Sequence, residues 1–128
     1  MEKRNEILEL SFEFAVQVIE FAELLEEKRK YVIARQLLKS GTSIGANIRE
    51  AQSCESKADF IHKLKISQKE AEETEYWLLL CAKATTYPKP PTIMNSQLLS
   101  IQKLLSKIIA TTREGLKGNR RIPKNDKN

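Results

Sequence analysis

Apolar residues recur every three or four positions along almost the whole chain, which is the spacing of α-helices. No stretch alternates between apolar and polar residues with the period of two that is typical of β-strands. The pattern predicts four helices, over residues 5–27, 30–53, 56–86 and 92–116. Ser56 caps the third helix, and Pro88, Pro90 and Pro91 follow its end. Four long helices with short connections predict an all-α fold, an antiparallel up-and-down four-helix bundle.

The predicted first helix is apolar over about two thirds of its circumference, which is more than one face of a small bundle requires. Either this helix lies at the centre of the bundle, or it also packs against a neighbouring subunit. In a chain of 128 residues we favour the second arrangement. The third helix has a similar extra apolar flank. We therefore expect a homo-oligomer whose interface contains Leu10, Phe14, Phe21, Ile66 and Trp77.

Two glycines, Gly41 and Gly45, lie inside the predicted second helix. Each glycine in a helix interior costs about 1 kcal/mol relative to alanine. Either a close approach to a partner helix or a bend in the helix accounts for them. A close approach at Gly45 further predicts that a leucine there overpacks the contact and destabilises the protein.

The net charge of +5 is distributed unevenly. Residues 1–27 have a net charge of −6, whereas residues 28–49 have a net charge of +6. On a helical wheel Lys28, Arg35, Lys39 and Arg49 share a sector of about 80° on the side away from the apolar stripe. This face is a solvated surface, a docking surface for the acidic first helix, or a surface for nucleic acid.

The end of the chain is also basic. Residues 117–128 have a net charge of +4 and few apolar residues to offset the entropy of ordering. We therefore expect a bundle over residues 1–116 and a disordered basic tail over residues 117–128, which serves either solubility or phosphate binding. The candidate nucleic-acid-binding residues are Lys28, Arg35, Lys39, Arg49, Lys117, Arg120, Arg121 and Lys124.

The sequence offers little for catalysis. Its one histidine, His62, cannot supply the two Glu-x-x-His pairs of a di-iron bundle, and we expect it on the surface. Cys54 and Cys81 lack metal-ligand spacing and are expected to be buried free thiols. We expect no enzyme activity, no cofactor and no small-molecule substrate. The chain also lacks a transmembrane run and a signal peptide, which predicts a cytoplasmic protein without membrane contact.

Two segments carry a resemblance to a known family. Residues 40–51, SGTSIGANIREA, and residues 59–78, DFIHKLKISQKEAEETEYWL, are similar to the signatures of the bacterial 23S rRNA intervening-sequence proteins. The accessory protein of diversity-generating retroelements is more loosely similar. The resemblance implies a homopentameric ring of four-helix bundles without known enzymatic activity. It also implies packing and register roles for Gly41, Ser43, Gly45, Asn47, Glu50, Glu70, Glu73 and Trp77.

Two classes of function remain open at this stage. In the first, a ring-forming protein binds RNA or DNA phosphates through its basic surface. In the second, the protein is an assembly module whose basic helix pairs with the acidic helix of a neighbouring subunit, without a role for nucleic acid. The salt dependence of binding distinguishes the two functions, because phosphate binding weakens steeply as the salt concentration rises and an apolar interface does not.

Overall fold

The computed structural model describes residues 5–126, with the side chains of residues 5–117. It contains four helices and, within these residues, no strand. The helices are α1 (Glu6–Glu27), α2 (Tyr31–Ala51), α3 (Lys57–Lys83) and α4 (Thr92–Asp126). The predicted cap of α3 is confirmed, because the backbone N–H of Asp59 donates to the Ser56 hydroxyl over 3.1 Å.

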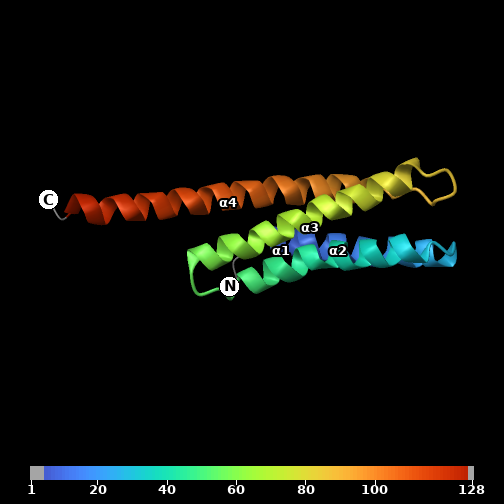
Figure 1. Cartoon of the computed structure of the whole chain (residues 1–128), viewed down its shortest axis with the longest axis horizontal. Helices are drawn as coiled ribbons and strands as arrows, with labels where there is room; N and C mark the ends of the chain where they lie inside the picture. Colours follow the sequence, from blue (N-terminus) through green and yellow to red (C-terminus); the bar gives the residue numbers. More distant parts are fainter. Residues whose placement is uncertain (1–4, 127–128) are drawn as a thin grey trace.

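The four helices form an up-and-down bundle in which each contacts two neighbours (Figure 1). Going round the bundle the order is α1, α2, α3, α4, and α4 closes the circle by contacting α1. Both the turn from α1 to α2 and the loop from α3 to α4 lie at one end (Figure 1). The predicted fold class is therefore confirmed.

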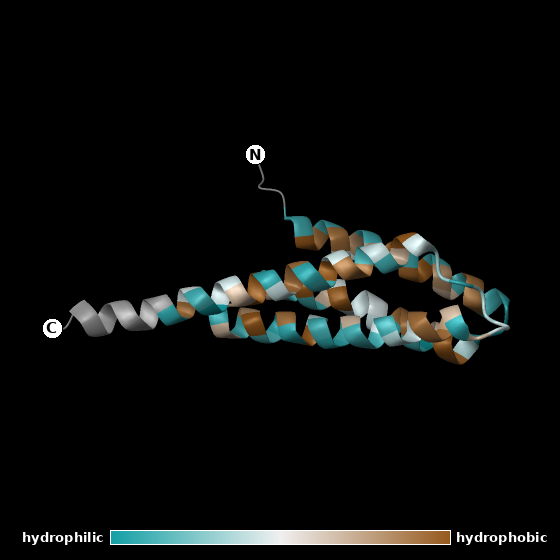
Figure 2. Cartoon of the chain, turned by 90° about the horizontal axis from the view of Figure 1, so that it is seen from above, coloured by the Kyte–Doolittle hydropathy of each residue, from teal (hydrophilic) through white to brown (hydrophobic). Residues whose placement is uncertain are grey.

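Each helix buries one apolar stripe in a common core. Figure 2 shows hydrophobic residues recurring at intervals along all the coloured helices. On α1 the stripe is centred on Val18 and includes Phe14 and Phe21, which are 0 % and 3 % exposed. The expectation that Phe14 and Phe21 form an outer flank for a second subunit is therefore wrong: both fill the core of their own chain.

The two glycines of α2 face α1 at short distance. A Cβ atom at Gly41 would lie 2.7 Å from Cγ2 of Val18, and one at Gly45 would lie 3.2 Å from the Ser11 hydroxyl. A contact below 3.0 Å leaves no room for a side chain unless Val18 moves. The predicted close approach between helices is therefore confirmed, and it is tighter at Gly41 than at Gly45.

Buried hydroxyl groups join α2 to α3. The Ser67 hydroxyl donates to the carbonyl oxygen of Ile44 over 2.9 Å. The hydroxyl oxygens of Thr74 and Ser40 are 2.9 Å apart in a second hydrogen bond, and Thr74 also donates to its own helix at the Glu70 carbonyl. These bonds set the register of α2 against α3, since a shift of one residue would leave the hydroxyls buried without partners.

The last helix is longer than the sequence predicted. We expected it to end at residue 116, one residue after Gly115, but α4 continues to Asp126 and extends past the other helices (Figure 1). Extending an existing helix costs much less than nucleating one, so a glycine does not by itself end it. The predicted tail, residues 117–128, falls outside the described side chains except for Lys117.

Candidate nucleic-acid interface

The four cations predicted on the second helix lie on the outside of the bundle. We call Lys28, Arg35, Lys39 and Arg49 the basic row. Arg35, Lys39 and Arg49 project from α2, whereas Lys28 is the C-cap residue of α1 and lies in the turn before α2. All four side chains are exposed. The row therefore extends from the α1–α2 turn to the last turn of α2.

The basic row faces solvent because the opposite side of α2 packs against α1 and α3. Gly41 and Gly45 contact α1, and Ser40 and Ile44 are hydrogen-bonded to α3. With its rotation set by these two contacts, α2 has one sector left for solvent, and this sector carries the cations.

No cation of the basic row forms an ion pair with a carboxylate of the described residues. Lys63 on α3 provides the contrast: its Nζ lies 2.6 Å from Oε1 of Glu50, and this hydrogen bond raises the pKa of the lysine. The charges of the row are thus available to an external anion. A phosphate is the simplest such anion, and Arg and Lys bind phosphates in most nucleic-acid complexes.

The other candidate cations are in α4. Lys117 is exposed. The side chains of Arg120, Arg121 and Lys124 lie outside the described residues, so their part in binding stays a prediction.

The remaining predicted interface residues are only half exposed. Leu10 and Trp77 pack against the core from its edge, and Ile66 is half-buried. The Trp77 indole N–H donates to Oε2 of Glu73 over 3.1 Å, which orients the ring along α3. These three residues retain some surface for a second subunit, unlike Phe14 and Phe21.

The largest exposed apolar side chains of α1 were missed from the sequence. Phe12 is 63 % exposed, and Val16 and Ile19 follow it at helical spacing on the same side. We call these three residues the apolar strip. Their helical spacing is visible in the sequence. The apolar arc of α1 is so wide, however, that the spacing does not show which side of the arc faces the core and which faces solvent.

The structure describes the histidine and both cysteines of the chain. His62 is exposed, as predicted. Cys81 is buried and Cys54 is half-buried, and burial raises the pKa of the Cys81 thiol. Within the described residues no group of three or more His, Cys, Asp or Glu could hold a metal ion. In the same part of the chain, no helix is long and apolar enough to cross a membrane.

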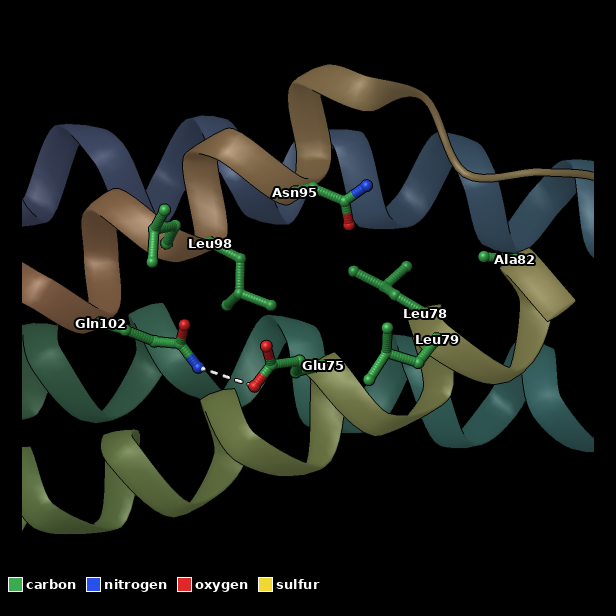
Figure 3. A pocket seen from close by; sticks show the side chains of 8 residues that line it. Glu75, Leu78, Leu79, Ala82, Asn95, Leu98 and Gln102 are labelled. Atoms are coloured by element: carbon green, nitrogen blue, oxygen red, sulfur yellow. Dashed lines mark hydrogen bonds between the residues drawn. The ribbon is translucent and has the colours of Figure 1, made fainter.

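A cleft of about 300 Å³ lies between α3 and α4 (Figure 3). Leu78, Leu79 and Leu98 line it with apolar surface. Across it the Gln102 amide donates to Oε1 of Glu75 over 3.4 Å. A single carboxylate that is already hydrogen-bonded offers no pair of groups for acid–base chemistry, so we interpret this cleft as the seam between two helices.

Fold and surface together define a four-helix-bundle protein with an exposed basic helix. Residues 3–110 match the family of 23S rRNA-intervening sequence proteins. The chain belongs to this family, as the two segments in α2 and α3 indicated.

A solved structure is also similar to this chain. It is the crystal structure of a protein with unknown function from the S23 ribosomal protein family of Bacteroides thetaiotaomicron. The two sequences are 45 % identical, the TM-score is 0.76, and the match covers 80 % of this chain and 97 % of the other. No curated protein matches the chain.

Proposed function

We propose that this protein is a non-catalytic homo-oligomer that binds RNA or DNA through phosphate contacts made by the basic row. One observation supports this proposal above the others: three exposed cations of α2 and a fourth in the turn before it have no carboxylate partner in the described part of the chain. Phosphate binding releases counterions, and this supplies affinity without any sequence readout. Binding is therefore expected to be weak per subunit and largely independent of sequence.

Oligomerisation is the second part of the proposal. The family resemblance implies a ring of five subunits, and the apolar strip on α1 supports association because an isolated bundle leaves it in water. A ring would repeat the basic row several times around one assembly. Several weak phosphate contacts made together bind far more tightly than one contact alone. We place this assembly in the cytoplasm.

The alternative function is a protein–protein assembly module. The described part of α1 carries Glu6, Glu9, Glu13, Glu20, Glu23, Glu26 and Glu27 and no cation. The basic row of one subunit could pair with this acidic helix of the next, which would cover the row and exclude nucleic acid. The binding experiment decides between the two functions.

The decisive experiment is an electrophoretic titration of the intact protein with a structured rRNA fragment and an unrelated duplex, at two salt concentrations. We expect both nucleic acids to shift and the affinity to fall steeply with salt. The double variant Arg35→Gln/Lys39→Gln should weaken binding and flatten the salt dependence. The control Lys65→Gln/Lys69→Gln removes the same charge from exposed positions of α3 and should bind as the unmodified protein does. Absence of any shift at low salt would contradict nucleic-acid binding and leave the assembly module as the remaining function.

Light scattering at micromolar concentration tests the oligomer. We expect a mass of several subunits, which Phe12→Glu lowers to that of a monomer because the charge cannot be buried in an apolar contact. Val32→Glu is the matched control, since Val32 on α2 is 67 % exposed against 63 % for Phe12. A monomeric mass for the unmodified protein would contradict the oligomer. If only Val32→Glu dissociates the oligomer, the interface between subunits lies on α2 and not on α1.

A further inference from the structure

The three tyrosines of the chain have different surroundings. The ring of Tyr87 is covered by Lys30, whose Nζ lies 4.9 Å from the ring centre. Tyr76 packs edge-on against Trp77 with their ring centres 5.3 Å apart. Tyr31 has neither a ring contact nor a side-chain hydrogen bond within the described residues, although it is 48 % exposed. Its aromatic face is thus available to an external ligand.

Tyr31 lies within the basic row. It is the first residue of α2, and Arg35 follows it one helical turn later on the same side. Lys28 precedes it in the turn, and Lys39 lies one turn beyond Arg35. An aromatic ring interleaved with cations is the arrangement by which proteins hold single-stranded nucleic acid, since the cations contact phosphates while the ring stacks on a base.

The basic row follows a single helix and the turn before it. α2 packs between α1 and α3, so only its outer side is left for a ligand. A duplex is wider than one helix and carries two rows of phosphates, so a row of cations along one helix can follow only one of its strands. A single strand lying along α2 would place its one row of phosphates on these cations.

We infer that the basic row binds single-stranded RNA or DNA in preference to duplex, with Tyr31 stacking on a base at the α1–α2 end. This inference rests on the proposed function and specifies its ligand. The row runs from the turn before α2 to Arg49, in the last turn of that helix, which is long enough for several nucleotides.

Fluorescence anisotropy with the intact protein tests the inference. The probes are labelled oligo-U and oligo-dT of twelve nucleotides and a twelve-base-pair DNA duplex, all at low salt. We expect both single strands to bind more tightly than the duplex. Tyr31→Ala should weaken single-strand binding by about tenfold, the effect of one lost stacking contact, and leave duplex binding unchanged. Tyr31→Phe keeps the ring and should bind normally.

Tyr76→Ala is the matched control, because Tyr76 is 56 % exposed but lies on α3. It should bind as the unmodified protein does, and circular dichroism should show that each variant remains helical. Equal affinity for single strand and duplex, together with no effect of Tyr31→Ala, overturns the inference and leaves the proposed function intact. Absence of binding to all three probes contradicts the proposed function itself.

Discussion

α2 and α4 each pack against two neighbouring helices, but they do so in different ways. α2 approaches α1 at Gly41 and is hydrogen-bonded to α3 through buried hydroxyls. Among the described residues of α4 the buried side chains are apolar, the Oε1 atom of Gln97 is buried without a hydrogen-bond partner, and the hydrogen bonds to α3 at Ser106 and Gln102 are exposed.

The difference indicates which of the two helices has the more narrowly defined position in the bundle. Small residues and buried hydrogen bonds permit one arrangement of α2, because any other leaves a clash or an unpaired polar group. Apolar contacts alone permit small shifts of α4 at low cost. The helix that carries the basic row is therefore the more rigidly held of the two, which a surface for phosphates requires.

The largest expected effect compares two leucines that are fully buried, Leu37 on α2 and Leu105 on α4. Truncation of a buried leucine to alanine costs about 2–5 kcal/mol, depending on how far the surroundings close the cavity. We expect Leu37→Ala to cost about 4–5 kcal/mol, because α2 cannot move, and Leu105→Ala about 2–3 kcal/mol.

Urea unfolding followed by circular dichroism measures both values, at one protein concentration because association contributes to stability. Equal costs for the two leucines would show that α4 is held as firmly as α2. A larger cost at Leu105 would reverse the comparison.

Gly41 provides the second test. Gly41→Leu should destabilise the protein by about 2–3 kcal/mol, since even its Cβ atom meets Val18 and a valine in a helix has little rotamer freedom. Gly115→Leu on α4 is the control: the nearest group there is the Lys57 amine at 3.6 Å, and leucine is the better helix former. Similar losses from both substitutions in thermal unfolding would refute the close approach as the cause.

The four helices could be predicted from periodicity, but the rotation of α1 could not. Its apolar arc is so wide that several rotations bury a stripe of similar hydrophobicity. The rotation is decided by α2, because Gly41 and Gly45 leave room for Val18 and Ser11 to pack against this helix. This interhelical contact places Phe14 in the core. A helical wheel of α1 alone cannot show the contact, because it does not include α2.

The candidate site was predicted in part. The cations of α2 share a face on the helical wheel, and each of them is exposed in the structure. The wheel did not show that Lys28 lies in a turn or that the ring of Tyr31 is uncovered. These features depend on the neighbouring helices, whose positions are set by packing.

Buried and exposed hydrogen bonds give the third test. Thr74→Val should cost about 1–2 kcal/mol, because it leaves the Ser40 hydroxyl buried without this partner. Gln102→Ala removes an exposed bond between α4 and α3 and should change stability by less than about 0.5 kcal/mol. The double variant Ser40→Ala/Thr74→Val should cost less than the sum of its single changes. Additive single effects in urea unfolding would contradict a direct bond.

The smallest expected effect concerns the turn that connects α1 to α2. The turn from α1 to α2 is tight: Arg29 has φ 62°, and the backbone N–H groups of Arg29 and Lys30 donate to the carbonyl oxygens of Glu26 and Leu25. This is a Schellman motif, in which glycine is usual at the position of Arg29.

Arg29→Gly should therefore stabilise the protein by about 0.5–1 kcal/mol, since glycine adopts positive φ without strain. Arg29→Val should destabilise it by about 1 kcal/mol, because a β-branched side chain fits this backbone worst. Thermal unfolding of the two variants measures the difference. If both are as stable as the unmodified protein, the turn relaxes freely, and α2 is then held by its interhelical contacts alone.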